Sequence, residues 1–246
     1  IEVYNQLLEE HPEDEAALAA LDGLYEEEEQ WAERAAIMER RLTLTDDVFD
    51  RRGLGESLAA IYEEKLDESA SACRVYERLR DDEPSWLQAH QRLESLYRGL
   101  ENWPDLERCL LAQIELCEED VERLRLKQAL AELYQHELAD PERAISGWRD
   151  VLAQDTNHAR AIGALDELLT ARGDQDALVE LLGHIIAHVP SELGHVLTHR
   201  RRARLLRDDL NRPDEAAGDW RALLAWQADD LESLVALSDI YERAAE

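Results

Sequence analysis

The chain has 246 residues, of which 45% are hydrophobic, and a formal net charge of −30 from 57 acidic and 27 basic side chains. So acidic a surface repels phosphate backbones and anionic lipid faces, which excludes nucleic acid as an expected partner. No apolar run is long enough to span a bilayer, so membrane insertion is excluded too. With one Phe, ten Gly and six Pro, a turn-rich all-β fold is also excluded, whereas the abundant Leu, Ala, Glu and Arg favour helices.

The first 65 residues contain four segments in which apolar residues recur at helical spacing. The His11-Pro12 pair ends the first segment, and Trp31 opens the third. Asp46 and Asp47 are candidate caps for the fourth. The predicted helices cover about residues 1–10, 13–28, 31–45 and 48–65.

The same pattern returns with a period of 72 residues and without a gap. One recurring position carries Tyr4, Tyr76, Trp148 and Trp220, and another carries Leu21, Leu93, Leu165 and Leu237. Pro141 and Pro213 mark corresponding helix starts, where the fixed φ of proline suits the first turn. The sequence therefore predicts one array made of units 1–72, 73–144 and 145–216 and a partial unit 217–246.

A helix that is apolar on two sides cannot bury both faces alone, so neighbouring hairpins must stack. The expected product is an all-α fold, a right-handed α-solenoid of antiparallel helix hairpins in which each 72-residue unit holds two hairpins. Trp148 and Trp220 are expected to fill the seams between hairpins, and Ala144 and Ala216 to allow close approach. No Gly/Ser-rich or Pro-rich linker interrupts the array.

Two stretches resemble the tetratricopeptide repeat (TPR) family. AALAALDGLYEEEEQWAERAAIMERRL (residues 16–42) has a first helix ending in Leu-x-x-Leu-Tyr, a short turn, and an aromatic residue that opens a second helix. SLAAIYEEKLDESASACRVYERLRDDEP (residues 57–84) resembles a second copy with its terminal Pro. The resemblance covers the whole chain and implies a TPR-like solenoid. Where the family has a small residue after the helix Leu, this chain has Asp22, Glu94 and Asp166.

The chain begins inside a helical pattern and ends where a helix gives way to a turn. Neither end shows the polar capping helix typical of a complete solenoid. We therefore expect a segment of a longer protein.

The sequence contains no Gly-rich phosphate loop, no Gly-x-Ser-x-Gly elbow and no His-Glu-x-x-His, so we predict neither enzymatic activity nor a cofactor. Three cysteines, Cys73, Cys109 and Cys117, lack Cys-x-x-Cys spacing and fall at packing positions of the repeat. They are expected to be buried free thiols in a reducing compartment, which suggests the cytoplasm.

Four histidines form two pairs with i,i+4 spacing on neighbouring helices: His184, His188, His195 and His199. At equal heights, the four imidazoles would suit a zinc or nickel site. The alternative, which we prefer, is that they are ordinary surface and edge histidines, and we predict no metal.

Charge changes along the repeat. Residues 1–72 hold 21 acids and 6 bases, whereas residues 145–216 hold 12 and 9, and residues 195–207 contain five arginines and no acid. In TPR arrays the first helix of each hairpin lines a concave groove, and the resemblance places a set of polar side chains there. The candidate partner-binding residues are Glu56, Glu63, Arg125, Gln128, Arg160, Arg200, Arg204 and Arg207.

One interpretation of Arg200, Arg204 and Arg207 is that they bind an acidic peptide or helix. The alternative is that they pair locally with Asp208, Asp209 and acids of the neighbouring hairpin. The leading functional hypothesis is a non-catalytic scaffold that binds another protein in its groove. Two others stay open: a structural solenoid that assembles head to tail into homo-oligomers, and a regulatory or sensor region of a larger signalling protein.

Overall fold

The computed structural model describes residues 1–190 and 192–245, and these residues form helices and short connections without a β-strand. The helices in chain order are α1 (Glu2–Glu10), α2 (Glu15–Glu27), α3 (Trp31–Leu44), α4 (Val48–Glu64), α5 (Ser69–Asp82), α6 (Leu87–Gly99), α7 (Trp103–Leu116), α8 (Asp120–His136), α9 (Pro141–Gln154), α10 (Ala159–Arg172), α11 (Gln175–His188), α12 (Glu192–Arg204), the π-helical turn η1 (Leu205–Asp209), α13 (Pro213–Trp226) and α14 (Leu231–Ala245).

The four helices predicted in the first 65 residues are confirmed to within a few residues at each end. Asp47 caps α4, because its carboxylate accepts hydrogen bonds from the backbone N–H groups of Phe49 and Asp50 (2.9 and 3.0 Å). Pro141 and Pro213 are the first residues of α9 and α13, where a missing N–H costs nothing.

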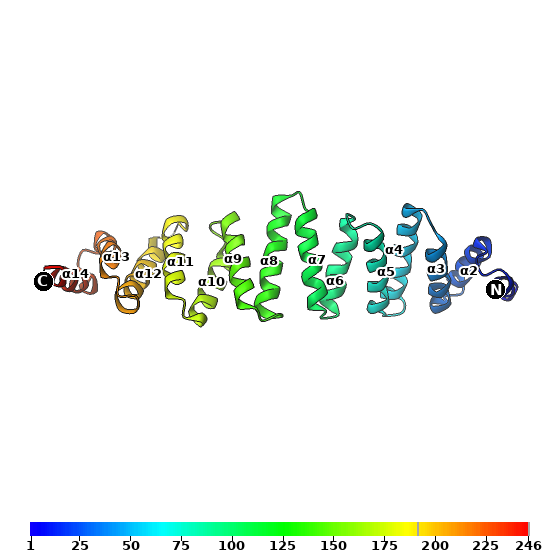
Figure 1. Ribbon diagram of the computed structural model, residues 1–246, viewed down its shortest axis with the longest axis horizontal. Helices are drawn as coiled ribbons and strands as arrows, with labels where there is room; N and C mark the ends of the chain where they lie inside the picture. Colours follow the sequence, from blue (N-terminus) through cyan, green and yellow to red (C-terminus); the bar gives the residue numbers. More distant parts are fainter. Residues whose placement is uncertain (191, 246) are drawn as a thin grey trace. The chain divides into compact units, whose positions relative to one another are not determined.

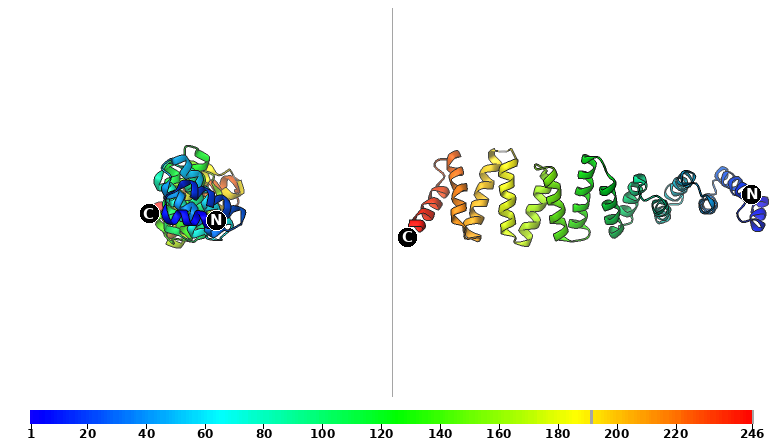
Figure 2. Two further views of the ribbon diagram at one scale, coloured as in Figure 1. Left: turned by 90° about the vertical axis from the view of Figure 1, so that its right-hand side faces the viewer. Right: turned by 45° about the horizontal axis from the view of Figure 1, so that its top comes forward.

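The chain divides into two compact units, residues 1–126 and 127–246, and the division falls inside α8. In unit 1, each helix from α1 to α6 packs against the next one in the chain, and in unit 2 the same holds from α9 to α13. Figures 1 and 2 show this succession of neighbouring helices in each unit. Sequence neighbours are therefore spatial neighbours, as in a helical-repeat protein.

A residue with left-handed backbone conformation follows each of the helices α2, α6 and α10. Glu29, Glu101 and Gly173 follow α2, α6 and α10 with φ of 54°, 54° and 71°. After each, the next backbone N–H reaches back to a helix carbonyl, as Gln30 N–H does to Tyr25 (2.9 Å). This is the Schellman arrangement that satisfies the last carbonyls of a helix. Asp67, Ala139 and Asn211 also have positive φ and lie two or three residues after the ends of α4, α8 and η1.

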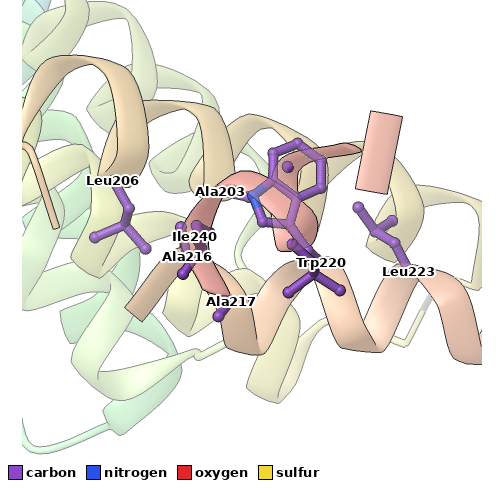
Figure 3. Close-up of a cluster of buried hydrophobic side chains, with 9 residues drawn as sticks. Ala203, Leu206, Ala216, Ala217, Trp220, Leu223 and Ile240 are labelled. Carbon is purple, nitrogen blue, oxygen red and sulfur yellow. The ribbon is translucent and has the colours of Figure 1, made fainter. Parts of the chain in front are cut away.

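The core is a series of seams in which one helix inserts a large aromatic residue between its neighbours. Figure 3 shows the seam of unit 2, a buried cluster that includes Trp220 of α13, Ala203 of α12 and Leu206 of η1. Trp220 and Ala216 are fully buried. In the seam around α9, Ala144 is fully buried too and Trp148 is 1% exposed. The predicted roles of these residues as buried packing positions are confirmed. Truncating such an aromatic residue to Ala costs about 3–5 kcal/mol in a core of this kind.

Candidate protein-binding groove

Two cavities in unit 1 lie on either side of α4. The first, of about 800 Å³, lies between α2 and α4 and extends to the α3–α4 connection. The second, of about 360 Å³, lies between α4 and α6 with Tyr76 of α5 at its base. We call α2, α4 and α6 the groove helices of unit 1, because most of the lining residues come from them.

The first cavity combines an apolar floor with an acidic rim. The floor includes Leu18, Leu44 and Leu54. Phe49 lies at the edge with 77% of its surface exposed, which is unusual for an aromatic side chain. The acidic lining residues are Glu15, Asp46, Asp47 and Asp50.

The second cavity holds both acidic candidates predicted in unit 1, Glu56 and Glu63, together with Glu64. Glu56 accepts a hydrogen bond from the amide of Gln88 on α6 (3.0 Å). Burial raises the pKa of the Tyr76 phenol at the base of this cavity, and the nearby negative charges of Glu63 and Glu56 add to the shift.

In unit 2, the three arginines predicted to line the groove are all paired with acids of the chain. Arg204 forms two hydrogen bonds with Glu232 of α14 (2.7 and 2.8 Å), and Arg200 pairs with Asp230 (2.7 Å). Arg207 pairs with Asp208 (2.6 Å), and its guanidinium lies 5.6 Å from the Trp220 ring centroid. This geometry matches the alternative of local pairing.

The electrostatics of these pairs agree with their geometry. The hydrogen bond from Arg204 lowers the pKa of Glu232, and the hydrogen bond from Arg207 lowers the pKa of Asp208. The pKa of Asp230 is lowered chiefly by a hydrogen bond from the Ser233 hydroxyl (2.5 Å), with Arg200 adding to the shift. Each acid is therefore held in its charged form beside an arginine.

The remaining candidates are also joined to acids. Arg160 of α10 pairs with Glu132 of α8 (3.1 Å), and Gln128 donates to the same carboxylate (2.8 Å). Arg125, in unit 1, lies 2.8 Å from Glu122 and 3.5 Å from Glu94.

A regular spacing in the sequence could have identified the acids that pair with these arginines. Arg204 and Glu232 are 28 residues apart, and so are Glu132 and Arg160. In both pairs the two side chains lie on helices two apart in the chain, α8 and α10 or α12 and α14, so complementary charges at that interval identify the partners.

The acids that replace the small TPR residue are accommodated by polar partners. Asp22 is buried and accepts hydrogen bonds from Arg34 (2.8 Å) and Arg41. Gln113, 72 residues after Arg41, donates to Glu94 (2.9 Å). A second charged or amide side chain thus compensates the burial of each of these two acids.

The four histidines do not form a metal site. In residues 1–190 and 192–245, no three His, Cys, Asp or Glu side chains are grouped so that they could hold a metal ion. His184 and His195 donate to the carbonyls of Thr156 and Val189 (2.8 and 2.6 Å). His199 is buried, not a surface or edge residue, and its Nδ1 lies 2.6 Å from Asp219.

Sequence reasoning missed the buried polar cluster around Asp219. This fully buried carboxylate also accepts two hydrogen bonds from Arg202 (2.8 and 2.7 Å). Leu58 and Leu130 occupy the position of Arg202 in the other copies, and Val75 occupies that of Asp219. An ion pair here stands at two positions that are apolar in the first copy.

The three cysteines are buried and unpaired, as predicted. Burial raises the pKa of Cys73 and of Cys109 to about 11. Both remain neutral thiols at pH 7, which is the unreactive form.

We compared the chain with protein-family models, curated proteins and solved structures. No protein-family model and no curated protein matches the sequence. Among solved structures, one chain of the Naa15/Naa10 complex bound to HypK-THB aligns with a TM-score of 0.55 and 18% identity, over 98% of this chain and 36% of that one. This protein has a TPR-like α-solenoid fold. The solenoid spans just over a third of the Naa15/Naa10 chain that it matches.

Two further similar structures are TPR proteins by description. The C-terminal part of a TPR repeat-containing protein from Cytophaga hutchinsonii aligns with a TM-score of 0.42 and 15% identity, over 96% of the solenoid and 92% of that chain. YrrB, a TPR protein with an unusual peptide-binding site, aligns with a TM-score of 0.41 and 16% identity, over 75% and 91%. Within the described part of the solenoid, no helix has the length and apolar character needed to cross a bilayer.

Proposed function

We propose that this solenoid is a non-catalytic scaffold that binds a segment of another protein along the groove helices of unit 1. The observation that supports the proposal is the pair of cavities on either side of α4. Together they offer a peptide or helix a surface with both apolar side chains and charged groups, the usual composition of a binding site.

The exposed side chains at the first cavity support the same function. Phe49 is exposed although an aromatic residue gains stability from burial, and Val48 beside it is 42% exposed. A partner that covers these two side chains recovers that stability as binding free energy. Aromatic residues at the centre of an interface commonly contribute most of the affinity.

A capture experiment tests this function. The purified chain and a groove-filled variant, Ala19→Arg with Ala60→Arg, are used as baits in lysate, and bound proteins are quantified by mass spectrometry. Ala19 lines the first cavity and Ala60 the second, so the two arginines obstruct both. The matched control is Ala32→Arg, which places a charge on an exposed position of α3.

The expected result is a set of proteins that the wild type and Ala32→Arg retain and the groove-filled variant loses. Circular dichroism verifies that all three baits are folded to the same extent. Identical sets for the three baits contradict the proposal.

A further inference from the structure

Resting on the proposed function, we infer that the cavity between α2 and α4 accepts a cationic segment of a partner protein, with Lys or Arg side chains flanking an aliphatic or aromatic anchor. The apolar lining of the cavity supports the anchor, and its acidic lining supports the positive charge.

The apolar floor requires the anchor. Leu44 and Leu54 line a cavity of about 800 Å³ beside the buried Leu18, and Phe49 lies at its edge, so an inserted Leu or Phe side chain contacts apolar side chains there. Burying such a side chain removes apolar surface from water and so favours binding. A segment that carries only charged side chains would leave these apolar side chains exposed to water.

The rim requires the positive charge. Glu15, Asp46 and Asp50 make no ion pair with any described residue of the chain, although all three line the cavity. The basic residue in the lining is Arg41, and its guanidinium is already paired with Asp22. Cationic side chains of a partner therefore meet carboxylates that have no competing partner.

The arginines of unit 2 are less available to an acidic partner than the acids of the first cavity are to a basic one. An acidic segment that binds Arg204 must first displace Glu232 from two hydrogen bonds, and one that binds Arg200 must displace Asp230. The acids of the first cavity impose no such competition. A second copy of this chain is also a poor occupant, because its net charge of −30 repels the rim.

Synthetic peptides test the inference directly. Fluorescence anisotropy measures binding of a fluorescein-labelled 12-residue peptide of Lys and Leu in helical amphipathic order. Two matched peptides replace Lys with Glu or Leu with Ser. Each is titrated with the whole chain, with Phe49→Ser, with Asp46→Asn/Asp50→Asn, and with the control Glu115→Gln/Glu118→Gln, which removes the same charge from residues that line no described cavity.

We expect the Lys/Leu peptide to bind, the other two to bind at least about tenfold more weakly, and both cavity variants to lose about tenfold in affinity while the control keeps it. Binding should also weaken as salt is raised from 50 to 300 mM. Equal affinities for the cavity variants and the control overturn the inference, as does equal binding of the Lys/Ser peptide. Failure here with groove-dependent capture in lysate leaves the scaffold function standing and removes only the cationic occupant.

Discussion

Arg204 and Glu232 are joined by two parallel hydrogen bonds between α12 and α14, one from Nε and one from a terminal guanidinium nitrogen. Arg200 approaches the same carboxylate at 3.3 Å. Two of the three candidate arginines, Arg200 and Arg204, therefore link α12 to α14 and the residue before it, whereas Arg207 pairs with Asp208 beside it in η1. The charges of Arg200 and Arg204 therefore hold neighbouring hairpins together.

We predict that Glu232→Gln lowers the stability of the chain by about 0.5–1 kcal/mol at pH 7, since both side chains are partly exposed and water screens the pair. The hydrogen bond from Arg204 lowers the pKa of Glu232 in the folded state. Its stabilisation is therefore fully present above the ordinary glutamate pKa and is lost as the pH falls through the lowered value. Urea unfolding of wild type and variant between pH 8 and 3 measures the difference, with Glu115→Gln as control. A difference that grows toward low pH contradicts the assignment.

The buried cluster behaves differently, because Asp219 has no access to water. We predict that Arg202→Leu costs about 3–5 kcal/mol, since it leaves a buried carboxylate without its bidentate partner. The double variant Arg202→Leu/Asp219→Val recovers about 2 kcal/mol or more of this loss, because it places apolar side chains at both positions, as at the equivalent and fully buried Leu58 and Val75.

Tryptophan fluorescence during urea unfolding measures these free energies. The matched control is Arg201→Leu, which breaks the exposed pair with Asp166 and should cost less than about 1 kcal/mol. Additive losses in the double variant would show that the two residues do not act as one buried pair.

Much of this architecture is predictable from the sequence because packing repeats. Trp148 and Trp220 recur at the same interval and are both buried, as their period requires. The partner of Arg204 is found only by comparing charges 28 residues apart, since Glu232 lies on α14, two helices further along the chain. Asp219 gives no periodic signal at all, since Val75 and Gly147 occupy its position elsewhere. For that reason His199 could be assigned neither its burial nor its partner.

A third prediction about stability concerns the residues with positive φ that follow α2 and α6. Glu29 and Glu101 adopt φ of 54°, which costs a residue with a side chain about 1–2 kcal/mol, whereas Gly173 at the same position of α10 incurs no such cost. We predict that Glu29→Gly and Glu101→Gly each stabilise the chain by about 0.5 kcal/mol after the entropy of glycine in the unfolded chain is subtracted. The reciprocal variant Gly173→Ala should destabilise it by about 1 kcal/mol. Thermal unfolding compares the three, and a loss of stability in both glycine variants would rule out the explanation.

The thiols of Cys73 and Cys109 provide a test of the core that requires no substitution. Because burial raises the pKa of both to about 11, only a small fraction is thiolate at pH 7.5, and the surrounding side chains exclude the reagent. We predict that iodoacetamide modifies neither cysteine in the native chain within an hour, and both within minutes in 8 M urea. Peptide mass spectrometry after quenching identifies the modified sites. Rapid native labelling of Cys109, which donates a hydrogen bond to the His90 carbonyl (3.0 Å), would mean that the α6–α7 hairpin opens readily.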